Sequence, residues 1–67
     1  MPQIHVTVLK GRSEHEIAAL GAALTTAASE ALGVARDVIR VTVTECEPDH
    51  WFVGGESMAR LRAAGER

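Results

Sequence analysis

The sequence predicts an α+β fold, in which one β-α-β unit with two parallel strands is followed by a short C-terminal hairpin. Segments 3–9 and 38–45 alternate between apolar and polar residues, which is typical of strands with one buried face. The segment between them has apolar residues at spacings of three and four, the pattern of an amphipathic helix. A strand, a long helix and a second strand in this order predict a right-handed crossover between parallel strands.

Each predicted strand has one aliphatic face. The residues on that face are Ile4, Val6 and Val8 in the first strand and Ile39, Val41 and Val43 in the second. The opposite face of each strand carries mostly polar side chains, and Arg40 is one of them. Because two strands alone do not make a stable sheet, we expect further strands from another source.

The helix is predicted over residues 14–32. Ser13 and Glu16 have the three-residue spacing of a capping box, which marks its start. Gly33 follows Leu32 as a candidate C-terminal cap. Many residues of the helix are small, so it can approach a sheet or another helix closely.

The remainder of the chain is short and rich in turn residues. Residues 46–56 place turn formers around the aromatic pair Trp51 and Phe52, which predicts a loop leading into a small hairpin. In so small a protein such a segment is suited to reaching a neighbouring subunit. Residues 57–67 are expected to form a C-terminal tail, and residues 1–67 a single domain.

Size and composition favour self-association. The chain has 67 residues, of which 46% are hydrophobic and only two are aromatic, so much aliphatic surface belongs to a chain that can bury little internally. The single cysteine, Cys46, excludes an intrachain disulfide, and it lacks metal-ligand spacing with His5, His15 and His50. We therefore expect no metal site and no cofactor, and oligomerisation as the source of additional core.

Charge and hydropathy argue against membrane and nucleic-acid partners. No apolar run approaches the roughly 20 residues of a membrane-spanning helix, and the N-terminus enters an alternating strand directly. The net charge is −2, with arginines scattered among acidic residues, which gives no electrostatic footprint for nucleic acid. We expect a cytoplasmic protein.

Pro2 directly follows the initiator methionine, and removal of Met1 would leave a secondary amine at the N-terminus. Apolar surroundings and nearby arginines lower the pKa of such an amine towards neutrality, where general-base catalysis is most efficient. A retained Met1 would instead make the nitrogen a tertiary amide without basicity. Proline at this position is also common where a strand simply begins, so Pro2 alone does not decide between the two interpretations.

Together these features resemble the short 4-oxalocrotonate tautomerase type of the tautomerase superfamily. The resemblance runs from Pro2 to about Glu56. The matching motifs, in chain order, are Pro2, Gly11-Arg12-Ser13, the long helix, Arg40-Val41, Thr44-Glu45, His50-Trp51 and Gly54-Gly55-Glu56. Their order and spacing within so short a chain make the signature specific.

The resemblance implies a cofactor-free isomerase in which Pro2 is the general base that moves a proton between carbons of a 2-hydroxydienoate or related enol. Arg12 would bind a substrate carboxylate. Arg40, donated by a neighbouring subunit, would polarise the 2-oxo and carboxylate groups, and Trp51 would wall the pocket. The resemblance also implies a homohexamer, a trimer of dimers with a four-stranded sheet in each dimer.

These implied roles agree with the chemistry of the side chains. A guanidinium binds carboxylate in a bidentate way that lysine cannot, which suits Arg12 and Arg40 to a dicarboxylate substrate. A fixed arginine also stabilises the negative charge that develops on the dienolate oxygen. The same cations would hold the Pro2 amine neutral.

Two departures from the family pattern bear on the substrate. Dehalogenating relatives carry an arginine and a water-activating glutamate where this chain has Leu9 and Val53, so hydrolytic dehalogenation is not expected. Trp51 replaces a smaller phenylalanine, and Phe52 stands where glycine is frequent, so the pocket would be narrower or reshaped. Both a substrate from aromatic-compound catabolism and one from biosynthesis stay open.

Simpler interpretations exist for each residue. On its own, Arg12 fits a solvated turn residue, Arg40 fits a solvent-facing strand residue equally well, and Trp51 fits an interface anchor. His5 and His50 are given no catalytic role. Two other functions remain open: a non-catalytic subunit of a mixed oligomer, and Michaelis-type addition through an enamine of the proline.

Overall fold

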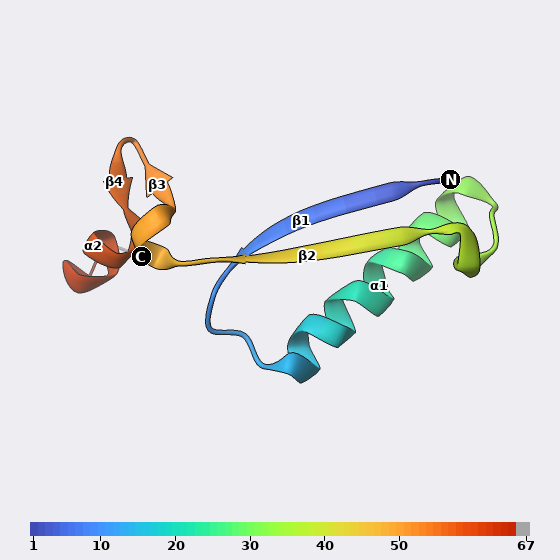
Figure 1. Cartoon of the computed structure of the whole chain (residues 1–67), viewed down its shortest axis with the longest axis horizontal. Coiled ribbons are helices and arrows are strands. Elements are labelled where there is room, and N and C mark those ends of the chain that lie inside the picture. Colours follow the sequence, from blue (N-terminus) through green and yellow to red (C-terminus); the bar gives the residue numbers. More distant parts are fainter. Residues whose placement is uncertain (66–67) are drawn as a thin grey trace.

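The chain is elongated in the computed structural model, which describes residues 1–65. Its principal extents are 45 × 24 × 15 Å and its radius of gyration is 15.1 Å, whereas a compact domain of this length would have a radius of about 11 Å. Figure 1 shows a β-α-β unit and, beyond the end of the second strand, a separate arm made of a hairpin and a short helix. The predicted α+β fold class is confirmed.

The β-α-β unit consists of β1 (Gln3–Leu9), α1 (Glu14–Leu32) and β2 (Arg40–Cys46). The two strands pair in parallel, with Gln3 opposite Arg40 and Leu9 opposite Cys46. Helix α1 runs along one face of this two-stranded sheet (Figure 1). The opposite face has no covering layer in the described part of the chain.

Both predicted caps of α1 are confirmed. The Ser13 hydroxyl accepts a hydrogen bond from the backbone N–H of Glu16 (3.1 Å), and the Glu16 carboxylate accepts one from the backbone N–H of Ser13 (3.0 Å). At the other end Gly33 adopts a left-handed conformation with φ of 67°, and its N–H donates to the carbonyl of Ser29 (2.9 Å). These bonds satisfy backbone groups that a helix end would otherwise leave unpaired.

The second strand is shifted from its predicted range of 38–45. Residues Arg36–Val38 form a 3₁₀ turn, in which the N–H of Val38 bonds the carbonyl of Ala35 (3.3 Å). Pairing with the first strand starts only at Arg40, whose N–H donates to the carbonyl of Pro2 (3.0 Å). At the other end pairing extends to Cys46, because its carbonyl accepts the N–H of Lys10 (2.8 Å).

The arm contains a 3₁₀ turn (Pro48–His50), β3 (Phe52–Val53), β4 (Glu56–Ser57) and α2 (Met58–Ala63). Strands β3 and β4 form an antiparallel hairpin. The predicted tail over 57–67 is wrong for its first part, because Ser57 caps a helix by accepting the N–H of Arg60 (3.2 Å). Residues 66–67 of that predicted tail lie outside the described residues.

Little of the protein is buried. Among residues 1–65, only Ile39 and Met58 are buried hydrophobic residues, while Leu32 and Phe52 are 60% and 61% exposed. The accessible surface is 4772 Å², against about 4,100 Å² for a compact monomer of this mass. Within the same described range, no helix is long and apolar enough to cross a membrane.

Candidate active site

The four residues singled out in the sequence fall at two ends of the sheet. Pro2 and Arg40 lie together at one end, joined by the backbone hydrogen bond between the two strands. Arg12 and Trp51 lie together at the other end, where both line a cavity of about 430 Å³. The seven residues of β1 separate the two ends, a length of about 23 Å at the usual rise per residue.

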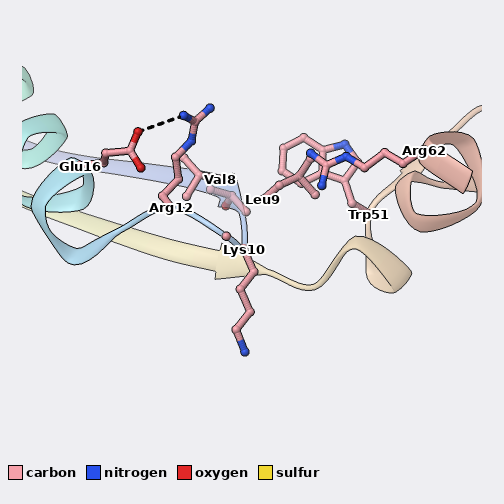
Figure 2. A pocket seen from close by; sticks show the side chains of 9 residues that line it. Val8, Leu9, Lys10, Arg12, Glu16, Trp51 and Arg62 are labelled. Carbon is pink, nitrogen blue, oxygen red and sulfur yellow. Dashed lines mark hydrogen bonds and ion pairs between the residues drawn. The ribbon is translucent and has the colours of Figure 1, made fainter. Parts of the chain in front are cut away.

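The cavity forms where β1 ends and the arm begins. Leu9 comes from the end of β1, Arg12 from the following loop and Glu16 from the first turn of α1. The arm contributes Trp51, which precedes β3, and Arg62 from α2. Figure 2 shows these side chains around the cavity, which therefore gathers two arginines and one indole.

Arg12 is paired with Glu16 across one helical turn. Its Nη1 lies 3.4 Å from Oε2 of Glu16, and both side chains remain about half exposed or more. The other carboxylate oxygen of Glu16 accepts the backbone N–H of Ser13. This hydrogen bond lowers the pKa of the Glu16 carboxyl from its ordinary value, and the nearby charge of Arg12 lowers it further. Glu16 is therefore an anion beside the cavity at neutral pH.

Lys10 is engaged elsewhere. Its Nζ lies 3.0 Å from Oε1 of Glu47, and this contact raises the pKa of Lys10. In Figure 2 the Lys10 side chain points away from Arg12 and Trp51. Because Glu47 immediately precedes the 3₁₀ turn that leads to Trp51, the ion pair ties the base of the arm to the end of β1.

The position of Trp51 depends on the arm. Its carbonyl accepts the N–H of Met58 (2.7 Å), and Met58 is one of the two buried hydrophobic residues of the described chain. Arg62 extends from α2 towards the indole of Trp51 (Figure 2). Arg62 is not among the site residues predicted from the sequence, because its segment was predicted to be a tail. The Ser57 cap was the signal that could have revealed the helix.

At the other end, a backbone carbonyl holds the Arg40 side chain. Nη1 of Arg40 donates to the carbonyl oxygen of Asp37 (2.8 Å), in the 3₁₀ turn just before β2. A neutral carbonyl orients the guanidinium without cancelling its charge, so Arg40 can still bind an anion. Met1 is 84% exposed, so its removal would leave no gap in the packing around Pro2.

Side chains of these types are chemically capable of carboxylate binding and proton transfer. An arginine can bind a carboxylate and stabilise negative charge, and a proline at a free N-terminus is a secondary amine that can accept a proton. No three His, Cys, Asp or Glu side chains within residues 1–65 are grouped so that they could hold a metal ion. Within one chain, strand β1 separates Pro2 from Arg12. A general base has to lie within hydrogen-bond distance of the proton that it removes. Pro2 therefore could not act on a small substrate that is bound to Arg12 of the same chain.

Known proteins are similar to this chain over most of its length. Residues 2–60 match a family model described as "Tautomerase enzyme". A probable tautomerase of Ralstonia nicotianae is 44% identical over 55 residues, which cover 82% of this chain and 79% of the relative. A probable tautomerase of Bacillus cereus is 36% identical over 59 residues, covering 88% of this chain and 97% of the relative.

Solved structures are similar over nearly the whole fold. TomN, a 4-oxalocrotonate tautomerase homologue in the tomaymycin biosynthetic pathway, has a TM-score of 0.91 and 56% identity, covering 92% of this chain and 95% of its own. A heterohexamer 4-oxalocrotonate tautomerase from Chloroflexus aurantiacus has a TM-score of 0.87 and 44% identity, covering 92% and 100% of the two chains.

Proposed function

Because the chain belongs to the tautomerase family, we propose that it interconverts the enol and keto forms of unsaturated 2-oxo acids, with Pro2 as general base after removal of Met1. The observation that best supports this proposal is the cavity at the end of β1. Arg12 and Trp51, which the family resemblance assigns to substrate binding, line it together although they are far apart in the sequence.

The proposed reaction needs no cofactor, because one amine serves both half-steps. The neutral Pro2 nitrogen removes a proton from the substrate, which leaves a dienolate, and the resulting ammonium then delivers the proton to a carbon of that dienolate. Arg40 stabilises the negative charge on the dienolate oxygen. Arg12 binds a carboxylate of the substrate, and the indole of Trp51 walls the site.

The proposed site is completed between subunits. Pro2 and Arg12 are separated by the length of β1 within one chain, so a substrate that contacts both has to meet residues of two copies. Self-association is also supported by the small core and by the exposed Phe52 of the hairpin. We propose a homohexamer built from dimers with four-stranded sheets; the Chloroflexus relative is itself a hexamer, of the mixed kind.

One relative bears on the choice of substrate. TomN is a homologue in a biosynthetic pathway and is 56% identical to this chain. This likeness makes a biosynthetic enol a candidate beside the dicarboxylate products of aromatic-compound catabolism. Assays with a panel of unsaturated 2-oxo acids that differ in their distal group would test this choice, since a catabolic enzyme should prefer the dicarboxylate.

The proposal is tested by the intact mass of the untagged protein together with ketonisation of 2-hydroxymuconate by the same sample. We expect a mass that lacks methionine, and turnover that falls by about 10²-fold or more in Pro2→Ala, as general-base catalysis contributes 10²–10⁴. Gln3→Ala changes the next residue of the same strand and should keep the turnover. A retained methionine without turnover, or full activity in Pro2→Ala, would contradict the proposal.

A further inference from the structure

The structure assigns a second task to Glu16: we propose that it is a positioning residue, whose carboxylate holds the Arg12 guanidinium ready to receive a substrate carboxylate. This inference rests on the proposed function, because it concerns the same cavity. Binding of a dicarboxylate that cannot react distinguishes failure of this inference from failure of the proposed function.

The two oxygens of the Glu16 carboxylate have different partners. Oε1 accepts the backbone N–H of Ser13 at 3.0 Å, which closes the capping box of α1. Oε2 lies 3.4 Å from Nη1 of Arg12. One carboxylate therefore links the start of the helix to the arginine, and the backbone of Ser13 fixes the carboxylate that fixes Arg12.

Arg12 needs such support because no other hydrogen bond or ion pair restrains its side chain within residues 1–65. Its side chain is 64% exposed, and holding a free arginine in one rotamer costs conformational entropy when a ligand binds. In Figure 2 the Glu16 carboxylate approaches Arg12 from the side away from Trp51. The contact uses a single nitrogen, Nη1, so other N–H groups of the guanidinium remain available towards the cavity.

The cap alone does not require glutamate. A glutamine at the same position can also close a capping box, with its carbonyl oxygen accepting the Ser13 N–H. Its remaining group would then be an NH₂, which is a donor facing another donor and cannot hold the guanidinium. Glu16→Gln therefore separates the two tasks, because it keeps the cap and removes the contact with Arg12.

Binding can be followed without turnover, because Trp51 is the only tryptophan and lines the cavity. The probe is cis,cis-muconate, a dicarboxylate that lacks the 2-hydroxyl and cannot tautomerise, titrated against Trp51 fluorescence. In Glu16→Gln we expect its Kd to rise roughly two- to fivefold, the range of an exposed ion pair. The KM for 2-hydroxymuconate should rise by a similar factor, with kcat nearly unchanged.

Two control variants exclude other causes. Glu14→Gln removes the same charge from the same helical turn. Within residues 1–65 the Glu14 side chain forms no hydrogen bond or ion pair with Arg12 or Ser13, so Kd should stay unchanged. Ser13→Ala removes the hydroxyl half of the cap while the backbone N–H still holds Glu16. This variant should lower the melting temperature without changing Kd.

The outcomes separate the inference from the proposed function. Weaker muconate binding in Glu16→Gln alone, in a protein without turnover, would support the inference and contradict the tautomerase proposal. Turnover with an unchanged or lowered Kd and KM in Glu16→Gln would overturn the inference and leave the proposal standing. A wild-type protein that does not bind muconate, or an equal loss of affinity in Glu14→Gln, would also overturn it.

Discussion

The backbone N–H of Arg40 donates a hydrogen bond of 3.0 Å to the carbonyl oxygen of Pro2, so the proposed base and the proposed electrostatic residue sit at the paired ends of two parallel strands. Arg12 follows the opposite end of β1, where it lines a cavity together with Trp51. The chain thus carries the predicted site residues at the two ends of one sheet. In the proposed site, association of copies brings Pro2 of one chain to Arg12 of another.

This geometry predicts complementation between inactive variants. Pro2→Ala and Arg12→Gln should each be inactive or weak alone, but a mixture unfolded and refolded together should regain activity. If one chain supplies Pro2 and another supplies Arg12, random assembly of equal amounts restores about one site in four. The measurement is ketonisation by the refolded mixture, compared with each variant refolded by itself. Activity no higher than the mean of the two would mean that each site takes both residues from the same chain.

Arg40 gives a prediction about the chemical step. Arg40→Gln leaves the backbone N–H that bonds Pro2 in place, so the sheet should persist while kcat falls by about 10²–10³, the effect of losing one stabiliser of an oxyanion. Arg40→Lys should recover only part of this loss, since an ammonium lacks the planar fork. Arg60→Gln, which removes an exposed arginine paired with Glu56 on the arm, is the charge-matched control and should keep kcat. Equal rates in Arg40→Gln and Arg60→Gln would remove Arg40 from the mechanism.

The lowered pKa of Glu16 gives a prediction about pH and stability. The carboxyl is more acidic in the folded chain than its ordinary 4.5, mainly because the Ser13 N–H bonds its charged form. A depressed folded-state pKa stabilises the fold above the unfolded-state pKa, and this stabilisation is lost as the pH falls through the lower folded value. The melting temperature should therefore drop below about pH 4.5, and it should drop less in Glu16→Gln.

The comparison is made on melting curves recorded by circular dichroism from pH 7 down to pH 3. The two proteins differ only in the carboxyl group at position 16, so the difference between the two curves isolates Glu16. Glu14→Gln should follow the wild-type curve, because within residues 1–65 the Ser13 N–H and Arg12 bond the Glu16 carboxylate and not that of Glu14. Parallel curves for wild type and Glu16→Gln would show that the capping contact does not depend on the charge.

Local patterns in the sequence were sufficient to predict the β-α-β unit. Alternation predicted the two strands, and their order with the long helix between them predicted the parallel pairing. Ser13 with Glu16 predicted the start of α1, because a capping box depends only on neighbouring backbone groups. The start of β2 was misplaced because Val38 and Ile39 fit a strand by residue type, yet the N–H of each is used by the 3₁₀ turn. Residue type does not reveal which hydrogen bonds the backbone makes.

The site was predictable only in part for a related reason. The motifs identified Arg12 and Trp51 separately. They line one cavity because β1 and β2 pair in parallel, so the loop after β1 and the arm after β2 begin at the same end of the sheet. Arg62 was not predicted to line the cavity, because its position depends on α2, a six-residue helix with a weak sequence signal. Contacts between distant segments follow from three-dimensional packing, which periodicity does not describe.

Two glycines of the helix region should respond in opposite directions to the same substitution. Gly33 ends α1 with φ of 67°, where a Cβ is strained, so Gly33→Ala should destabilise the fold by about 1 kcal/mol. Gly21 lies inside α1, and a Cβ there would meet no atom within 4 Å, so Gly21→Ala should stabilise it by about 0.5–1 kcal/mol. Urea unfolding of both variants, at one fixed protein concentration, measures the difference. A loss of stability in Gly21→Ala would mean that another copy packs closely against this side of the helix.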